Sequence, residues 1–246
     1  MTHHDYNYPA YSFAMEAPEL ERWQHAAPAL GDLAPDFDLE TTDGRRVRLA
    51  ELRGRAVVVE FGSYTCPIFC GRIDAMDALT RDFPDATFLT IYVREAHPGE
   101  KIGPHADMSE KRQLAARMRD EERLARALLV DDVAGTVHRT YGGGWDPVFV
   151  IDASGRVVLR RLWNDPQAVR GALESLAAGR PATAESVEFT PPPPRGAAGA
   201  AFVDRGGEQS LLDFYLTAPP PVRARFDASE SDEVRRALAA AKRERR

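Results

Sequence analysis

The stretch Arg55-Ala-Val-Val-Val-Glu-Phe-Gly-Ser-Tyr-Thr-Cys-Pro-Ile-Phe-Cys70 decides the fold, because a strand runs directly into a helix within it. Its short run of β-branched apolar residues predicts a buried strand over residues 55–61. Pro67 suits the first turn of a helix, which we expect to extend to Asp82. Cys66 therefore lies at a strand-to-helix turn rather than within an element.

Strand and helix patterns alternate on both sides of this stretch. Further strands are expected over residues 87–93, 128–130, 148–151 and 157–162, and helical segments over 109–127, with Ser109 as N-cap, 136–141 and 165–178. Alternation of this kind requires a parallel sheet covered on both faces, and a closing antiparallel hairpin makes the sheet mixed. We therefore predict an α/β fold with a mixed central sheet, helices on both faces and an N-terminal β-hairpin that turns at Asp43-Gly44.

Three regions are expected along the chain. Residues 1–30 form an N-terminal arm with one short helix near 18–24, residues 31–180 form the α/β domain, and residues 181–246 form a Pro-rich linker and tail. In the tail, the proline runs 191–194 and 219–221 indicate stiff extended linkers, and residues 231–246 indicate a terminal helix. The apolar segment Leu211–Leu216 is expected to pack against another surface. We favour packing on its own domain over binding to a partner.

Composition excludes several classes of function. The net charge of −6 argues against nucleic-acid binding, and no apolar run approaches the ~20 residues that span a bilayer. The N-terminus lacks a basic segment followed by an apolar one, so we expect a cytoplasmic protein without membrane contact. His3, His4 and His25 do not cluster with acids or thiols, and no metal site is expected.

Cys66 is the candidate nucleophile. A thiol at a helix start feels free backbone N–H groups and the positive end of the helix dipole, which lower the thiol pKa and favour the thiolate. The neighbouring hydroxyls of Ser63, Tyr64 and Thr65 could hydrogen-bond the thiolate or a leaving group, and Pro67 starts the helix. The alternative interpretation is a small, buried apolar cysteine.

Cys70 lies four residues further on, about one helical turn from Cys66. Their Cα atoms would then be ~6 Å apart, which is within the range of a disulfide, so Cys70 could resolve an oxidised Cys66. The alternative is a core residue of the helix.

Glu95 and His97 follow the neighbouring buried strand. Because the carboxyl ends of parallel strands meet at one edge of a sheet, we expect these side chains to lie near Cys66. The imidazole is a candidate proton donor or base, and the carboxylate would raise its pKa. His105, in the next loop, is a weaker candidate of the same kind.

Two separated motifs carry a family resemblance. Phe61-Gly-Ser-Tyr-Thr-Cys-Pro-Ile-Phe69 resembles the active-site segment of iodothyronine deiodinases, with Cys66 in the place of selenocysteine. Ile91-Tyr-Val-Arg-Glu-Ala-His97 resembles the strand of that family that ends in Glu-Ala-His. The resemblance covers residues 31–178. It implies a thioredoxin-like, redoxin-type fold, Cys66 as nucleophile, and Glu95 with His97 as a proton-handling pair.

Besides Cys66 itself, the sequence departs from the family pattern at several places. One is the step Asp146-Pro147 before the later strand, where the family's substrate-binding arginine is expected. Tyr64 stands where the family often has a cysteine. Lys111 and Arg112 stand where a second family histidine is expected, which leaves His105 as its nearest substitute.

These observations predict a thiol-dependent oxidoreductase that reductively dehalogenates a small aromatic substrate. No bound cofactor is expected, and an external thiol or a thioredoxin-type protein would act as reductant. The alternatives are a peroxidase or a thiol–disulfide oxidoreductase that uses Cys66 and Cys70, and, from another class, a non-catalytic interaction module with a thioredoxin fold. The sequence leaves a homodimer open.

Overall fold

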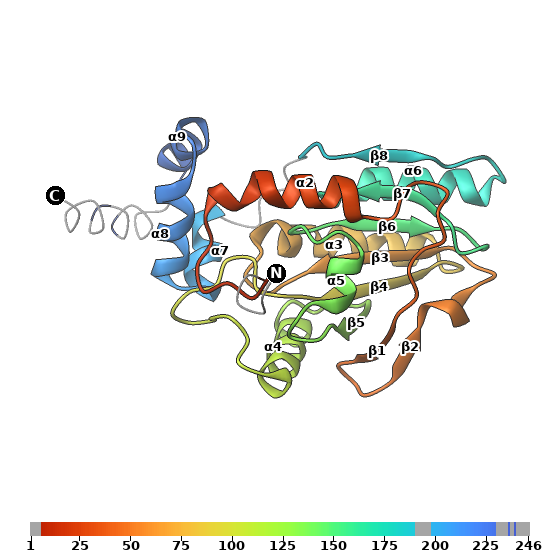
Figure 1. Cartoon of the computed structure of the whole chain (residues 1–246), viewed down its shortest axis with the longest axis horizontal. Helices are drawn as coiled ribbons and strands as arrows, with labels where there is room; N and C mark the ends of the chain where they lie inside the picture. The colour runs from red at the N-terminus through yellow and green to blue at the C-terminus, as the bar shows by residue number, and fades with distance from the viewer. Residues whose placement is uncertain (1–5, 190–197, 230–235, 237–238, 240–246) are drawn as a thin grey trace.

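A computed structural model of the chain describes residues 6–189, 198–229, 236 and 239 (Figure 1). Within these residues, eight strands form one mixed sheet in the order β2-β1-β5-β4-β3-β6-β7-β8. The strands are β1 (Asp38–Thr41), β2 (Arg46–Arg48), β3 (Val57–Gly62), β4 (Thr87–Tyr92), β5 (Ala127–Val130), β6 (Val148–Ile151), β7 (Val157–Arg161) and β8 (Ala184–Ser186). The predicted mixed α/β sheet with its N-terminal hairpin is confirmed.

The helical segments are η1 (Phe13–Met15), α2 (Glu16–Ala26), η2 (Leu49–Leu52), α3 (Pro67–Asp82), α4 (Met108–Glu121), α5 (Thr136–Thr140), α6 (Pro166–Ala177), α7 (Ala198–Arg205), α8 (Glu208–Thr217) and α9 (Pro220–Ser229). Helices α2, α3, α4, α5 and α6 follow the predicted order, and α3 has the predicted bounds, whereas η1, η2, α7, α8 and α9 were not predicted. No helix among the described residues is long and apolar enough to cross a membrane.

Strand β3 lies at the centre of the sheet and positions the site. It pairs in parallel with β4, from Val57 opposite Thr87 to Gly62 opposite Tyr92, and antiparallel with β6 on its other side. The carboxyl ends of β3 and β4 are therefore neighbours. The segments that follow them, residues 63–66 and 94–97, meet at one edge of the sheet, as the sequence predicts.

The two faces of β3 belong to separate apolar layers. Val57, Val59 and Phe61 pack on one face with residues of α2 and of the segment after α5. Val58 packs on the other face with residues of α3 and α6. The period-two alternation of a strand explains why neighbouring valines serve opposite layers. Figure 1 shows α2 and α5 on the near side of the sheet.

The N-terminal arm is part of the packed structure. Tyr6, Tyr8 and Tyr11 are buried although this region of the sequence shows no helical or strand period. The guanidinium of Arg94 lies over the rings of Tyr6 and Tyr8, at 4.7 and 5.1 Å from their centres. It also forms an ion pair of 3.1 Å with Glu19 of α2. These cation–π contacts and this ion pair hold the arm on the segment that follows β4.

In the tail, residues 198–229 are helical rather than extended. Phe202, Leu211 and Tyr215 of α7 and α8 form a small apolar core of their own. The expectation of an extended linker at residues 219–221 is wrong, because Pro220 begins α9, where its missing N–H leaves no helical hydrogen bond unmade. The proline run 191–194 lies outside the described residues, as does most of the predicted helix 231–246. Figure 1 shows α7, α8 and α9 gathered at one end of the molecule.

Two further boundaries differ from the sequence-based expectation. Helix α4 is capped by Asp107, whose carboxylate accepts from Glu110 N at 2.9 Å, instead of by Ser109. It ends at Glu121, and Ala127, expected to be the last helical residue, begins β5. Strand β8 was not predicted. It is three residues long and lies at the edge of the sheet, which leaves little pattern to detect.

Candidate active site

Cys66 is the N-cap of α3, as the sequence predicts. Its backbone is extended, and its Sγ accepts a hydrogen bond from Phe69 N at 3.4 Å. The side chain is 1% exposed. Burial raises the pKa of the thiol to about 12 and the negative charge of Asp146 adds to this effect, while backbone N–H groups and Arg72 oppose it. The expected lowering of the pKa is therefore wrong for this closed structure, because loss of solvent outweighs the helix terminus.

Cys70 lies one turn along α3, and both cysteines are free thiols. Its N–H donates to the Cys66 carbonyl at 3.1 Å, and its Sγ lies 3.6 Å from the Tyr64 carbonyl oxygen. Burial raises the pKa of this thiol well above its ordinary value. The two thiols share one turn of the helix, and resolution by Cys70 stays a prediction.

Two hydroxyls of the cysteine loop join it to the segment after β4. Ser63 Oγ accepts from Ala96 N at 3.0 Å. Thr65 Oγ1 donates to Glu95 Oε2 at 2.6 Å and accepts from His97 N at 3.0 Å. Each hydroxyl therefore has a partner in residues 95–97, and the two loops form one hydrogen-bonded unit. The partners of both hydroxyls lie at the neighbouring strand end, and support of the thiolate or of a leaving group by Ser63 and Thr65 stays a prediction.

Tyr64 points away from the thiol. Its hydroxyl donates to Glu121 of α4, and its ring lies between the guanidinium groups of Arg117 and Arg205, each 5.4 Å from the ring centre. The predicted hydroxyl support from Tyr64 is wrong, because an ion-rich site at the end of α4 binds this hydroxyl. Pro67 occupies the first turn of α3, as predicted.

Glu95 is the centre of the buried polar network. Its Oε2 accepts from Thr65 N at 2.8 Å, Tyr92 donates its hydroxyl to Oε1, and His105 Nε2 lies 3.3 Å from Oε1. Burial alone would raise the pKa of this carboxyl, but the hydrogen bonds from His105, Thr65 and Tyr92 outweigh it and hold the pKa below its ordinary value. The imidazole that meets Glu95 is thus that of His105, the weaker candidate of the sequence.

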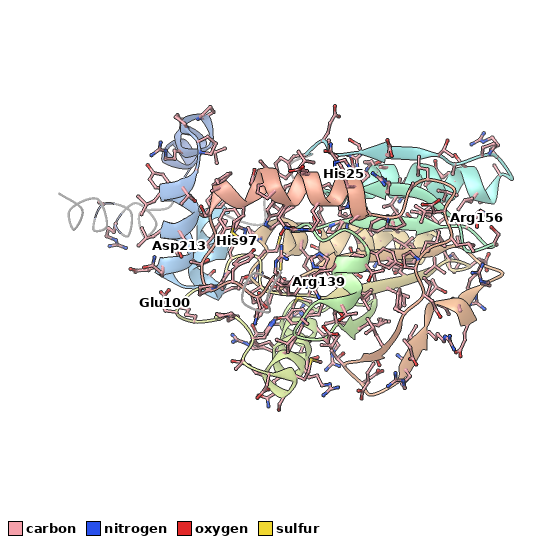
Figure 2. All side chains as sticks on the ribbon, viewed as in Figure 1. His25, His97, Glu100, Arg139, Arg156 and Asp213 are labelled. Carbon is pink, nitrogen blue, oxygen red and sulfur yellow. The ribbon has the colours of Figure 1, made fainter. Side chains whose placement is uncertain are left out.

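His97 joins the site through its backbone, while its ring packs among aromatic side chains. Ring centres of Tyr11, Phe202 and Phe214 lie 4.5, 4.7 and 5.5 Å from its own. Among the described residues, Nδ1 has no hydrogen-bond partner. Burial lowers the pKa of His97 to about 3, against a smaller opposing effect of Glu95, so the ring is neutral at pH 7. Figure 2 shows His97 at the end of the molecule where α7 and α8 lie.

Asp146 and Arg72 form a buried ion pair that sequence reasoning missed. The side chain of Arg72 is 2% exposed and that of Asp146 is fully buried. Burial raises the pKa of Asp146 to about 7, although Arg72 opposes this, and the carboxylate acts on the Cys66 thiol. Two signals could have pointed to the pair: an Asp-Pro step directly before a buried strand, and the position of Arg72 among the buried residues of α3.

An aromatic-lined groove lies beside these residues. It has a volume of about 580 Å³ and runs between η1, the start of α2, the end of α8 and the pair Trp145–Trp163. The two indoles are stacked, with centres 5.6 Å apart and planes 9° from parallel. Trp145 belongs to the same apolar cluster as Cys66 and Cys70. The groove therefore offers flat apolar surface on the cluster that contains the thiols, although neither cysteine lines it.

This arrangement suits thiol chemistry coupled to proton transfer. It holds two thiols on one helical turn, a carboxylate bonded to an imidazole, and a carboxyl with a pKa near neutrality. Among the described residues, no three His, Cys, Asp or Glu side chains converge in a way that could hold a metal ion.

Comparison with known families and proteins points to one family. The family model described as iodothyronine deiodinase matches residues 15–166. Thyroxine 5-deiodinase of Homo sapiens is 31% identical over 135 residues, which are 50% of this chain and 44% of that protein. The same enzyme of Gallus gallus is 31% identical over 135 residues, 50% of this chain and 52% of that protein. The chain thus spans about half the length of the curated relatives it matches.

Solved structures resemble the chain in fold. An uncharacterized conserved protein from Geobacillus kaustophilus superposes with a TM-score of 0.53 at 21% identity, covering 66% of this chain and 87% of that one. A protein described as "Thiol:disulfide interchange protein DsbE" from Chlorobium tepidum gives 0.50 at 20% identity, covering 62% and 98%. These likenesses support the thioredoxin-like fold and, at such identities, nothing further.

Proposed function

The chain belongs to the iodothyronine deiodinase family, within the thioredoxin-like superfamily, and from this premise we propose that it is a thiol-dependent oxidoreductase that reductively dehalogenates an aromatic substrate. One observation carries the proposal. Cys66 caps α3 with its Sγ on a backbone N–H, and the Thr65 beside it is held by the buried carboxylate of Glu95. This arrangement supports a nucleophilic role for the thiol and a proton-handling role for the carboxylate beside Thr65.

In the first step, the Cys66 thiolate attacks the halogen of the substrate. The carbon–halogen bond breaks and a sulfur–halogen bond forms, so the sulfur is oxidised and the ring is reduced. The electron pair left on the ring carbon takes up a proton, which gives the ring C–H bond. Glu95 with His105 is the nearest buried carboxylate–imidazole pair, and we assign this proton delivery to it.

In the second step, Cys70 gives its proton to the Glu95–His105 pair, which lost one in the first step, and the resulting thiolate attacks the Cys66 sulfur, so that halide leaves. This forms a disulfide within the first turn of α3, which must loosen because both side chains lie along the helix. An external thiol or a thioredoxin-type protein then reduces the disulfide by exchange and restores both thiols.

The aromatic groove supports an aromatic substrate. Stacked indoles and Phe13 offer ring faces, and Glu16 and Thr217 supply polar groups at its margin. Aromatic rings gain energy from such offset and edge contacts beyond the area that they bury. A substrate ring held there would lie against Trp145, the neighbour of Asp146.

A second candidate function is thiol–disulfide exchange with a protein. The spacing of the two thiols favours it, because Cys66 and Cys70 can alternate between dithiol and disulfide without any halogenated substrate. A peroxidase would use the same two sulfurs, through a sulfenic acid on Cys66.

The deciding experiment measures thiol-dependent iodide release from an iodinated phenol, with peroxide consumption and reduction of a model disulfide in parallel. Wild type should release iodide, Cys66→Ser should release none, and Cys70→Ser should stop after one turnover unless a small thiol replaces Cys70. If the protein reduces the disulfide but releases no iodide, its function is thiol–disulfide exchange and the dehalogenation proposal is wrong.

A further inference from the structure

We propose that the aromatic groove binds an aromatic ligand that carries a positively charged amine, and that the carboxylate of Glu16 selects this ligand against one that carries a carboxylate. Glu16 is then a specificity-determining residue of the groove. This role rests on the proposed function, because it specifies the charge on the aromatic substrate.

The walls of the groove present flat aromatic faces. Trp145 and Trp163 stack with ring centres 5.6 Å apart, and Phe189 meets Trp163 at 71° with centres 5.2 Å apart. Phe13 supplies a further ring, and its backbone N–H donates to Thr217 Oγ1 at 3.2 Å, which joins η1 to the end of α8. The face of an indole attracts a cation as well as another ring, so these walls suit an aromatic amine.

The same rings belong to the apolar cluster of the thiols. Trp145 is buried in the cluster that contains Cys66 and Cys70, and Phe13 and Trp163 pack against that cluster. A ligand ring seated on the two indoles therefore rests on the cluster from which the thiols would act. This continuity is the reason to treat the groove ligand as the substrate of the proposed reaction.

Glu16 is the only ionisable side chain among the described residues that line the groove. It begins α2, where the free N–H groups of a helix start favour an anion. Its Oε1 accepts from the Tyr11 hydroxyl at 2.7 Å, and no other hydrogen bond or ion pair reaches the carboxylate from the described part of the chain. Burial raises the pKa of this carboxyl, and only the hydrogen bond from Tyr11 opposes that effect. The anion thus lacks a cation to balance it.

The other charges of this region already have partners. Glu19, one turn further along α2, pairs with Arg22 at 2.6 Å and with Arg94 at 3.1 Å. Arg161, at the end of β7, pairs with Asp165 at 3.5 Å. The groove therefore presents one unbalanced negative charge among aromatic faces, which attracts an ammonium group and repels a carboxylate.

The test compares three iodinated ligands of similar shape by isothermal titration calorimetry at pH 7: a phenylpropylamine, the matching alcohol and the matching carboxylate. The amine should bind about tenfold more tightly than the alcohol, because it gains an ion pair with Glu16 and contact with the indole faces. The carboxylate should bind most weakly. Quenching of tryptophan fluorescence by the iodine checks that the ligands reach the indoles.

Glu16→Gln is the deciding variant. The amide keeps an acceptor for the Tyr11 hydroxyl and removes the charge. The amine should therefore lose roughly fivefold in affinity, the carboxylate should gain, and the alcohol should be unchanged. Trp163→Leu removes one of the stacked indoles and should weaken the binding of all three ligands.

Glu21→Gln is the matched control. Glu21 is exposed on the same helix and does not line the groove, so its substitution changes the net charge equally and should leave all three affinities unchanged. Equal affinities of the three ligands for the wild-type protein, or equal effects of the two glutamine variants, would overturn the inference.

Failure of the proposed function and failure of this inference give different results. If the amine binds through Glu16 but no iodide is released from the iodinated phenol, the dehalogenation proposal is wrong and the groove remains a site for aromatic amines. If iodide is released while Glu16→Gln leaves every affinity unchanged, dehalogenation stands and the selection by Glu16 is wrong.

Discussion

Burial acts on the ionisable residues of the site in opposite directions. It raises the pKa of Cys66 to about 12 and lowers that of His97 to about 3, because in each case the charged form loses its solvent. Glu95 differs because three hydrogen-bonding partners stabilise its anion. In this closed conformation both thiols are therefore protonated at pH 7, and turnover requires either opening or a local proton acceptor.

The neutral ring of His97 makes stability depend on pH. Its folded pKa lies below the ~6.5 of the unfolded chain, so the unfolded state binds more protons between these values and stability falls as pH drops below 6.5. His97→Phe should therefore lose less stability than wild type between pH 7 and pH 5, and its melting temperature should fall less. The free energies of unfolding lost by the two proteins should differ by up to ~2 kcal/mol, at ~1.4 kcal/mol per pH unit.

The same substitution at His25, which is exposed on α2, serves as the control and should keep the wild-type slope. The measurement is thermal unfolding at several pH values. Equal slopes for all three proteins would show that His97 is not buried as a neutral ring. Burial also lowers the pKa of His138, so the His97 variant should keep part of the pH dependence of stability.

Glu95 and His105 should matter for turnover more than the ring of His97 does. Glu95→Gln removes the anion that His105 meets, and His105→Asn removes the imidazole, so each should reduce iodide release ~10²-fold, as expected for lost acid–base catalysis. His97→Asn keeps the backbone hydrogen bond to Thr65 and should lose less. If His97→Asn loses more iodide release than His105→Asn, then His97 and not His105 transfers the proton.

At the scale of elements, the loop after β4 joins the active-site strand to the tail. Both oxygens of Glu100 accept from the first N–H groups of α8, those of Glu208 and Gln209, at 2.6 and 2.9 Å. Lys101 donates to the Val203 carbonyl at 2.7 Å, and Ser210 donates to the His97 carbonyl at 2.8 Å. The loop after β4 thus caps α8, and the same loop holds α7 and α8 over the site.

Glu100→Ala should therefore loosen the cover. Loss of a helix cap costs ~1 kcal/mol, and if that free energy holds α8 closed, alkylation of the thiols should become roughly fivefold faster at constant pH. The readout is the rate of thiol modification under native conditions, followed by intact mass.

Asp165→Ala is the control, because Asp165 caps α6, a helix outside the tail, and accepts from Gln167 N at 2.9 Å. It should lower stability by a similar amount and leave the alkylation rate unchanged. Faster alkylation in both variants would mean that general instability, rather than release of α8, exposes the thiols.

At the scale of the whole molecule, the arm and the tail meet over the active site. Tyr11 of the arm stacks on Phe214 of α8 with ring centres 5.7 Å apart, and both rings pack on His97. Among the described residues, two apolar clusters of the sheet contain no residue of α7 or α8, whereas Phe214 of α8 packs against the third, which holds Cys66 and Cys70. The tail therefore covers the site without completing the core of the domain.

A chain ending at residue 189 should fold, because both sheet layers remain intact. Its melting temperature should fall by a few degrees, because His97, Tyr11 and Tyr64 lose the tail residues that cover them. Its thiols should be alkylated about tenfold faster or more, because the tail no longer covers the site. Circular dichroism, thermal unfolding and thiol modification check these points. An aggregated or unfolded product would show that α7 and α8 are needed for the domain itself.

The sequence by itself determined the layout of the domain and the place of its thiols. The β-branched run at 57–59 required a buried strand, and Cys66-Pro67 required a helix start, because both are local steric effects. Sheet adjacency then placed residues 95–97 next to 63–66.

Tertiary structure decided which groups those residues meet and which of them carry charge. His105 instead of His97 meets Glu95, and Asp146 meets Arg72, although no spacing in the sequence links these partners. Burial in the folded chain raises the pKa of both thiols, because desolvation depends on every segment that excludes water from a group, however distant in the chain.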